Sequence, residues 1–206
     1  MLWDRDKKVN EENIELTLEA IASIGLTEES LLTNISPLAP APNKNDSDVG
    51  RLLIQHEATG KAIRLFDKHK KRLTDYAYWF YLSTCWVSYS GFSDLNLWRQ
   101  LFSSSRPNRK LSIMKPSEVV AYELLPDEFV IYRAKRDGEK DWIAYTLNPE
   151  TAAKMALQRK VSVIHQYKVK KKEVLALFLR RGEAEVIILD KSKPELLDVI
   201  QVNIED

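Results

Sequence analysis

The stretch EFVIYRAKRDGEKDWIAYTLNPETAAKMALQ, residues 128–158, decides the fold class of this chain. We interpret its first segment, 128–134, as an alternating β-strand and its second segment, 141–147, as another strand. Its last segment, 148–158, opens with asparagine, a good N-capping residue, and then proline, which suits a first helical turn. The stretch therefore predicts a strand, a second strand and then a helix.

Outside this stretch, helical patterns come before it and strand patterns come after it. Capping residues and apolar spacing predict a series of helices before residue 126, and short apolar runs predict three more strands after residue 158. Helices followed by strands predict an α+β fold, in which a helical N-terminal region packs on a small β-sheet core. The expected helices cover residues 10–25, 48–72 with a possible break at Gly60, 74–88, 93–102 and 116–125, and the later strands cover 160–169, 173–179 and 183–189. Nine of the nineteen aromatic residues lie between residues 76 and 98, which predicts an aromatic-rich core for two of the helices.

The composition is that of a soluble globular protein of 206 residues, with 44% hydrophobic and 30% charged residues. No apolar run approaches the roughly 20 residues of a membrane helix, and the N-terminus has no apolar signal-peptide core. The single cysteine, Cys85, excludes a disulfide framework, and three scattered histidines argue against a zinc site. We therefore expect a cytoplasmic protein that needs no metal and does not bind membranes.

The net charge of +1 conceals an acidic front and a basic body. Residues 1–60 carry 5 Lys and Arg against 11 Asp and Glu, whereas residues 61–206 carry 26 against 19. The closely spaced Pro37, Pro40 and Pro42 mark a linker or a strapped-down arm. The predicted division is an N-terminal helix and Pro-rich arm over residues 1–47 and a domain over residues 48–206, helical in 48–125 and strand-rich in 126–206.

Common catalytic and nucleotide-binding motifs are not found in the sequence. The six glycines form neither a phosphate loop nor a dinucleotide fingerprint, and there is no serine-hydrolase elbow or zinc-protease motif. Three polar residues of the strand-rich part remain as candidates: Arg133 in the first strand, Thr146 at the end of the second, and Glu185 in the last. Their order and the predicted structure around each form the main functional pattern of the chain.

This pattern resembles the arginine–serine–glutamate class of ADP-ribosyltransferases, and in particular its compact bacterial and phage toxins. The matching segments are Tyr132-Arg133-Ala134, Ala144-Tyr145-Thr146 before an alanine-rich helix, and Glu183-Ala184-Glu185. The likeness covers residues 126–190. It departs from the family pattern at Ala134, where the family has glycine, and at Ala144, where it has the first serine. The resemblance implies a split β-sheet core with NAD as substrate in the cleft between its parts.

Chemistry gives each candidate a role in such a site. Cleavage of the bond between nicotinamide and ribose passes through an oxocarbenium-like state, which the carboxylate of Glu185 would stabilise. The forked guanidinium of Arg133 suits the pyrophosphate of NAD. A regular strand would place Glu183 on the same face as Glu185, and in the family the first glutamate orients or deprotonates the acceptor.

Aromatic and hydroxyl side chains complete the predicted site. Tyr145 or Trp142 would stack on the cationic nicotinamide ring, and Thr146 would supply the hydroxyl that Ala144 lacks. The predicted catalytic residues are Glu185, Glu183 and Arg133, and the predicted NAD-binding residues are Arg133, Tyr132, Tyr145, Thr146 and Trp142.

All of these candidates except Tyr145 also have a purely structural alternative. Arg133 would pair with Glu139 or Asp137 at the surface, and Thr146 would simply end a strand before a helix. The remaining alternatives are that Glu183 and Glu185 are solvent-facing strand charges and that Tyr132 and Trp142 are core residues.

The predicted function is transfer of ADP-ribose from NAD to a macromolecular acceptor, either nucleic acid or protein, by a toxin of a bacterial or phage conflict system. The basic tract Lys168–Lys172 and the pair Arg180-Arg181 would suit phosphate backbone. An antitoxin or the acidic N-terminal segment would cover the basic cleft, so removal of residues 1–47 would raise activity. The alternatives are a catalytically inactive module of the same fold that binds nucleic acid or a partner protein, and NAD hydrolysis without an acceptor.

Overall fold

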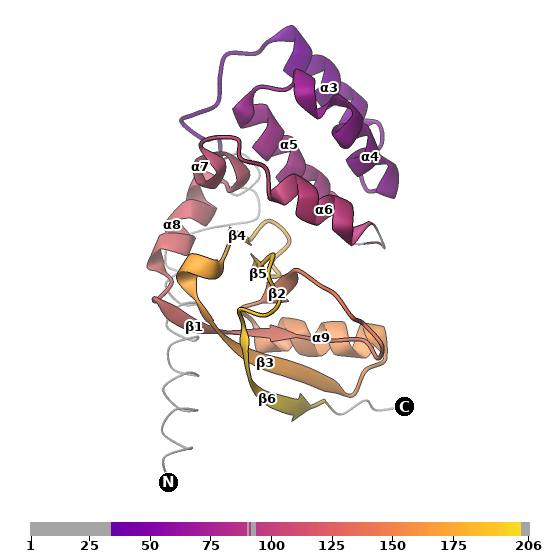
Figure 1. Ribbon diagram of the computed structural model, residues 1–206, viewed down its shortest axis with the longest axis vertical. Helices are drawn as coiled ribbons and strands as arrows, with labels where there is room; N and C mark the ends of the chain where they lie inside the picture. Colours follow the sequence, from indigo (N-terminus) through magenta and orange to yellow (C-terminus); the bar gives the residue numbers. More distant parts are fainter. Residues whose placement is uncertain (1–33, 90, 92–93, 203–206) are drawn as a thin grey trace. The chain divides into compact units, whose positions relative to one another are not determined.

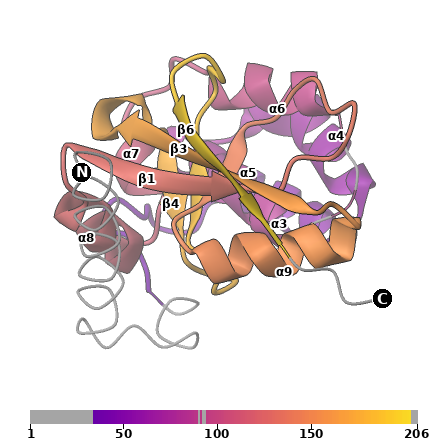
Figure 2. The ribbon, with the colours of Figure 1, turned by 90° about the horizontal axis from the view of Figure 1, so that it is seen from below.

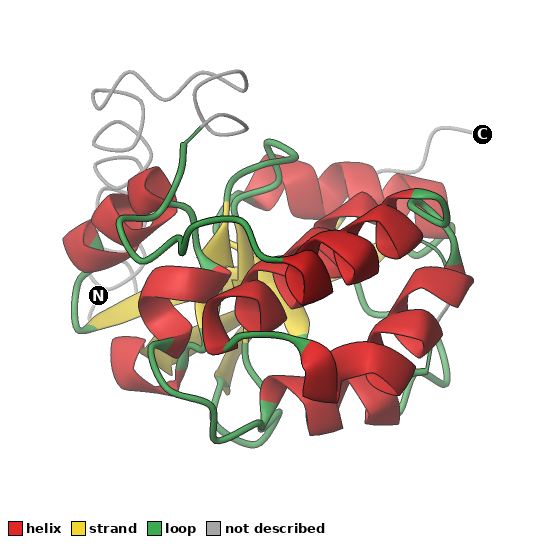
Figure 3. Ribbon diagram, turned by 90° about the horizontal axis from the view of Figure 1, so that it is seen from above, coloured by secondary structure: helices red, strands yellow, loops and turns green. Residues whose placement is uncertain are grey.

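The computed structural model describes residues 34–89, 91 and 94–202 (Figure 1). The chain divides into two compact units, one of residues 33–119 and one that holds residues 120–206 together with residues 1–32. The helix expected over residues 10–25 lies outside the described residues. Among the described residues, all strands belong to the second unit and the first unit is helical. The chain thus combines helices (red in Figure 3) with strands (yellow), so the predicted α+β class is confirmed.

Side chains that cap the helices explain where the helices of the first unit begin. Asn43 accepts a hydrogen bond from the amide of Asp46, and Thr74 accepts one from the amide of Ala77. Residues 55–59 separate the first two helices, and Gly60 opens the second. The helices are α3 (Lys44–Ile54), α4 (Gly60–His69), α5 (Asp75–Ser88), α6 (Leu95–Phe102), α7 (Arg109–Ile113) and α8 (Pro116–Leu124), with a short 3-10 turn at Lys70–Arg72. The first turn of α7 falls in a segment where the sequence predicted only a loop, and α8 continues into the second unit.

Aromatic side chains of α5 and α6 fill the core of the first unit, as the sequence predicted. The ring of Trp86 meets that of Trp98 edge-on at 4.9 Å between centroids, and Trp98 stacks on Phe102 at 5.7 Å. Trp79 and Trp98 are among the largest fully buried side chains. Burial of such large apolar surfaces is the main source of stability for this unit.

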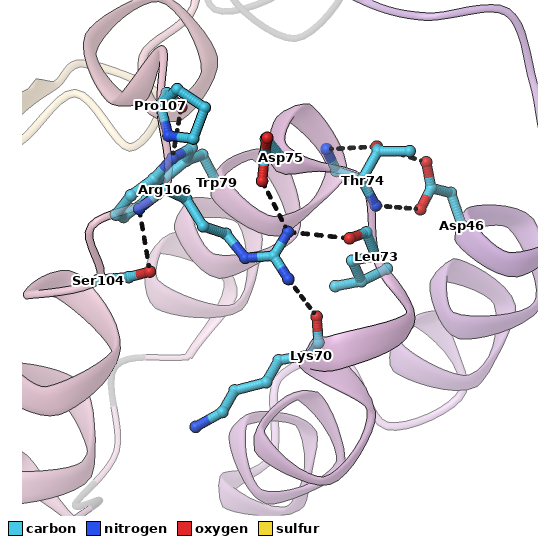
Figure 4. A network of polar contacts seen from close by, with 10 residues as sticks. Asp46, Lys70, Leu73, Thr74, Asp75, Trp79, Ser104, Arg106 and Pro107 are labelled. Atoms are coloured by element: carbon cyan, nitrogen blue, oxygen red, sulfur yellow. Dashed lines mark hydrogen bonds and ion pairs between the residues drawn. The ribbon is translucent and has the colours of Figure 1, made fainter.

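Arg106 ties the start of α5 to the end of α4 (Figure 4). Its guanidinium donates to the carbonyl of Leu73 at 2.9 Å and to the carbonyl of Lys70 at 3.0 Å. The same group pairs with the carboxylate of Asp75 at 2.9 Å. On the other side of this turn, the carboxylate of Asp46 accepts from both the amide and the hydroxyl of Thr74, at 2.9 and 2.7 Å.

The second unit contains one six-stranded sheet in the order β4-β5-β2-β1-β3-β6, with every neighbouring pair antiparallel. The five predicted strands are present, and β6 is a sixth that the sequence did not predict. The strand β2 is shorter than expected from residues 141–147. The strands are β1 (Glu128–Arg133), β2 (Ala144–Thr146), β3 (Val163–Lys170), β4 (Ala176–Phe178), β5 (Glu185–Ile187) and β6 (Glu195–Gln201).

The helix α9 (Pro149–Arg159) connects β2 to β3 and covers one face of the sheet (Figures 1 and 2). Asn148 caps it by accepting from the amides of Glu150 and Thr151, which confirms the predicted helix start. The small side chains of Ala152 and Ala156 let the helix approach Val130 and Ile164 of the sheet closely.

Strands β1 and β2 are joined at a single registered pair, Tyr132 with Thr146, whereas β1 and β3 pair along six residues of each strand. The sheet is therefore nearly divided between β4-β5-β2 and β1-β3-β6.

The strand register determines which side chains share a face of the sheet. Directly paired residues of antiparallel strands point to the same face, and successive residues point to opposite faces. Thr146 pairs with both Tyr132 and Glu185, so these three lie on the face that α9 covers. Arg133 pairs with His165 and follows Tyr132, so it starts from the opposite face.

Candidate active site

A turn of four residues before β5 brings two glutamates and an arginine together. Gly182 and Ala184 adopt left-handed backbone conformations, with φ of 68° and 43°, so residues 181–184 do not continue the strand. Glu183 lies in this turn, and Glu185 is the first residue of β5. The two carboxylates are neighbours because the turn folds back on itself, and not because of the regular strand alternation expected from the sequence.

Arg181 bridges the two glutamates. Its Nη2 atom lies 2.7 Å from a carboxylate oxygen of Glu183 and 3.5 Å from one of Glu185. The side chains of Arg181 and Glu183 are about a quarter exposed, and that of Glu185 is 10% exposed. The pair of carboxylates therefore carries its own counterion, and the Glu183 oxygen that faces Arg181 is itself buried.

Thr146 fastens this turn to the end of β2. Its hydroxyl donates to the carbonyl of Glu183 at 2.5 Å and accepts from the amide of Asn148 at 3.0 Å. The amide of Leu147 donates to the carbonyl of Ala184 at 3.0 Å. Thr146 thus acts on the glutamates through their backbone, and its hydroxyl also supports the start of α9.

Arg133 is 8% exposed at the end of β1, where its guanidinium is held from two sides. It donates to the carbonyl of Ala144 at 2.6 Å and pairs with Glu139 at 2.5 Å. The pairing with Glu139 was one of the structural alternatives, but it occurs in a buried position and not at the surface. The Nε atom of Arg133 is buried without a hydrogen-bond partner in the part of the chain that the structure describes.

The ring of Trp142 lies over the guanidinium of Arg133 and continues into a group of aromatic side chains. It lies 5.5 Å from the ring centroid of Trp142, whose Nε1 donates to the hydroxyl of Tyr145 at 2.8 Å. Tyr145 meets Tyr167 edge-on at 5.5 Å. Two lysines, Lys135 and Lys191, also lie over the Trp142 ring, at 5.0 and 5.5 Å. Two of these three cations also pair with carboxylates, Arg133 with Glu139 and Lys191 with Asp141 at 3.7 Å.

The other predicted site residues have clear positions in the core. Tyr132 is 3% exposed and packs with the alanines of α9, and its hydroxyl accepts from Gln166 at 3.4 Å. Ala134 belongs to the same core cluster, so its methyl group packs inside the unit. The two departures from the family pattern therefore differ: Ala134 fills the core, and Ala144 offers its carbonyl to Arg133.

The glutamate turn (residues 181–184, with Glu185) precedes β5, and the Arg133 cluster (Arg133, Trp142 and Tyr145) lies at β1 and β2; the two begin from opposite faces of the sheet. Strands are spaced by about 4.8 Å, so β1 and β5 are about 10 Å apart with β2 between them. Within β2, Tyr145 belongs to one cluster and Thr146 to the other. The structure thus brings Thr146, Glu183 and Glu185 together, and separately Arg133, Trp142 and Tyr145.

Arg159, at the end of α9, links the two clusters electrostatically and was not singled out from the sequence. It donates to the carbonyl of Ala134 at 2.5 Å. Burial lowers the pKa of its guanidinium, the charge of Arg133 lowers it further, and the charges of Glu139 and Glu183 raise it. Both clusters therefore lie within electrostatic reach of one side chain. Its only sequence signal was a cation in the last turn of a helix, which is too common to indicate a site.

The basic tract Lys168–Lys172 has structural roles. Lys168 pairs with Glu128 at 2.8 Å, and Lys170 approaches the same carboxylate at 3.8 Å. The ammonium of Lys171 donates to the carbonyls of Glu123 and Leu125, at 2.7 and 2.9 Å, and so caps the end of α8. These contacts favour the connecting-turn interpretation of the tract.

Two further groups have pKa values displaced by their surroundings. Burial raises the pKa of the Cys85 thiol to about 12, with a smaller contribution from the charge of Glu57. Burial, followed by the positive charges of Lys135 and Arg133, lowers the pKa of His165.

Within residues 34–89, 91 and 94–202, no cluster of three or more His, Cys, Asp or Glu side chains is arranged to hold a metal ion. None of the helices in the described ranges is long and apolar enough to cross a bilayer. Comparisons of the chain with protein-family models, curated proteins and solved structures found no match.

Proposed function

We propose that this protein is a mono-ADP-ribosyltransferase that moves ADP-ribose from NAD to a macromolecular acceptor. The observation that carries the proposal is the hydrogen bond from Thr146 to Glu183, which fixes the glutamate turn beside β2. The three strands that bear the family-like motifs, β1, β2 and β5, are adjacent in the sheet. The near-division of the sheet between β1 and β2 also agrees with the split core that the resemblance implies.

In this proposal the chain's own residues bind and orient NAD from two sides. Arg133 contributes a buried guanidinium with an unused Nε donor, which fits an oxygen of the pyrophosphate. Trp142 and Tyr145 give an aromatic wall beside it. Glu139 forms an ion pair with Nη2 of Arg133. On NAD binding, a phosphate oxygen would replace this carboxylate as the partner of Arg133.

Glu185 stabilises the positive charge that develops on the ribose as the bond to nicotinamide breaks. Nicotinamide leaves with the bonding electrons, and the acceptor nucleophile forms the new bond to the same ribose carbon. Glu183 takes the acceptor's proton, which its position at the more exposed end of the turn allows. The resemblance further supports a cytoplasmic toxin of a bacterial or phage conflict system, with an antitoxin as a natural partner and nucleic acid or protein as acceptor.

The second candidate is a module of this fold that binds nucleic acid or a partner protein without catalysis. It is favoured by the state of Arg133, whose guanidinium is engaged by Glu139 and by the carbonyl of Ala144.

Labelled NAD separates these functions in one experiment. The protein is incubated with NAD labelled in its adenylate part, together with RNA, DNA or protein from cells, and nicotinamide release is measured in parallel. Glu185→Gln tests the carboxylate, and Glu195→Gln, which changes an exposed glutamate of β6, is the matched control. A transferase labels one fraction, and the label is lost with Glu185→Gln but not with Glu195→Gln.

Two other outcomes count against transfer. Free ADP-ribose as the sole product, with no labelled fraction, assigns NAD hydrolysis. A folded protein that releases no nicotinamide and labels nothing favours the binding module.

A further inference from the structure

The proposed reaction gives no role to Arg181, although this residue contacts both glutamates. One of its nitrogen atoms, Nη2, lies between the two glutamates, at 2.7 Å from Glu183 and 3.5 Å from Glu185. Two carboxylates held this close repel each other, and a shared cation removes the repulsion. Without the cation, the side chain with more freedom would move away.

Glu183 is the carboxylate that depends most on Arg181. It lies in a turn and not in a strand, and its side chain is more exposed than that of Glu185. Glu185 is held in β5, where it pairs with Thr146 of β2 and Phe178 of β4. Arg181 is also nearer to Glu183: its Nη2 forms an ion pair at 2.7 Å with Oε2, a buried atom for which the described residues provide no hydrogen-bond donor.

The backbone of the turn serves the same contact. Left-handed conformations at Gly182 and Ala184 return the chain on itself, so that residues 181, 183 and 185 converge. Left-handed backbone is costly for alanine, so Ala184 shows that this turn geometry is imposed by its surroundings. The hydrogen bonds from Thr146 and Leu147 to the turn provide that restraint.

We propose that Arg181 is a positioning residue that holds Glu183 beside Glu185 and thereby favours transfer to the acceptor over hydrolysis of NAD. This inference rests on the proposed function. In transfer, the bond between ribose and nicotinamide breaks, the acceptor atom bonds to the ribose carbon, and the acceptor proton passes to Glu183. In hydrolysis, the oxygen of water bonds to the same ribose carbon and its proton passes to bulk solvent, so this route does not need Glu183. A displaced Glu183 weakens the first route, whereas Glu185 still supports nicotinamide release.

The test compares Arg181→Gln with Arg181→Lys, and uses Lys154→Gln as the matched control. Lys154 is an exposed cation of α9, so its loss changes the net charge equally without touching the glutamates. Nicotinamide release and labelled acceptor are measured in the same reactions, with the KM for NAD and the melting temperature of each variant.

We expect Arg181→Gln to lower labelled acceptor by about 10-fold to 100-fold, the scale known for the loss of a residue that orients a metal ligand. Nicotinamide release and the KM for NAD should change much less, so the ratio of transfer to hydrolysis falls. Arg181→Lys, which keeps a cation, should recover part of the ratio. If Arg181→Gln does not fold, an intermediate ratio for Arg181→Lys supports the proposal, and the wild-type ratio overturns it.

Other results overturn the inference in distinguishable ways. If Arg181→Gln behaves like Lys154→Gln in an active enzyme, Arg181 has no positioning role and the proposed function stands. If release and transfer fall together with the melting temperature, Arg181 is merely structural. If the wild-type protein releases no nicotinamide, the proposed function fails and this inference fails with it.

Discussion

The hydroxyl of Thr146 donates to the carbonyl oxygen of Glu183 at 2.5 Å, from the last residue of β2 to the turn before β5. This bond joins the end of one motif to the start of another across 37 residues of sequence. Thr146 therefore restrains the backbone of the glutamate turn and does not contact the carboxylates themselves.

Replacement of Thr146 by valine should loosen the glutamate turn. Thr146→Val keeps the shape of the buried side chain but removes the donor, so the free energy of unfolding should fall by about 1 kcal/mol or more. Labelled-acceptor formation should fall as well, whereas Thr146→Ser should retain most of it. Equal activities of the valine and threonine proteins would show that the hydroxyl is dispensable.

The left-handed glycine of the same turn gives a second prediction. Gly182→Ala and Gly138→Ala both place a methyl group in open space at φ near 70°, so each should lower the free energy of unfolding by about 1 kcal/mol. Gly182→Ala should lower transferase activity more than Gly138→Ala does, because Gly182 lies in the turn that holds Glu183, whereas Gly138 only precedes Glu139, the partner of Arg133. A similar activity loss in both variants would attribute the effect to stability alone.

Arg106 should be important for the stability of the helical unit. Arg106→Gln breaks the bonds to the carbonyls of Leu73 and Lys70, so we expect a loss of about 1–3 kcal/mol in chemical unfolding. Arg64→Gln, on the exposed side of α4, is the matched control and should change stability by less than about 0.5 kcal/mol. If Arg106→Gln leaves the free energy of unfolding almost unchanged, water replaces these contacts without loss of stability.

His165 should make the protein less stable in mild acid. Its pKa is lowered in the folded state by burial and by Lys135 and Arg133, so the unfolded chain binds a proton more readily. Stability should therefore fall as the pH decreases through the unfolded-state value of about 6.5. His165→Phe keeps a ring against Tyr167, and its melting temperature should depend less on pH between about pH 7 and pH 5 than that of the wild-type protein. An unchanged pH profile would assign the dependence to other groups.

The acidic N-terminal segment can be tested by truncation. If it covers the basic surface, removal of residues 1–33 should raise activity, and unchanged or lost activity would argue against the cover. The truncation should keep Asn43 and Asp46, because Asn43 caps α3 and Asp46 holds the start of α5.

The sequence predicted elements whose signals are local. Asn148 and Pro149 predicted the start of α9, and the strand patterns predicted β1 and β3; the alternation expected of β1 is absent, because every residue of it after Glu128 is buried. The strand β6 was missed because its exposed and half-buried residues follow no clean alternation, and its pairing with β3 is interrupted after Gln166. Whether a sixth strand pairs there depends on distant residues.

Within the site, the sequence identified residue types but not their directions. The conformation of Ala184 left no trace in the sequence, since alanine gives no hint of a left-handed φ, and so Glu183 was expected in a strand. The choice between Glu139 and Asp137 as partner of Arg133 depended on the loop from β1 to β2, whose path no local pattern sets.

The buried thiol of Cys85 has a practical consequence for future measurements. Because it is the only cysteine and its pKa is raised to about 12, it should not react with maleimides near neutral pH. Cysteines introduced at exposed positions, such as Arg64 of the helical unit and Gln158 of the strand-rich unit, would then be the only sites to take a fluorophore or spin label. Distances between the two units can therefore be measured, with and without NAD, without first replacing Cys85.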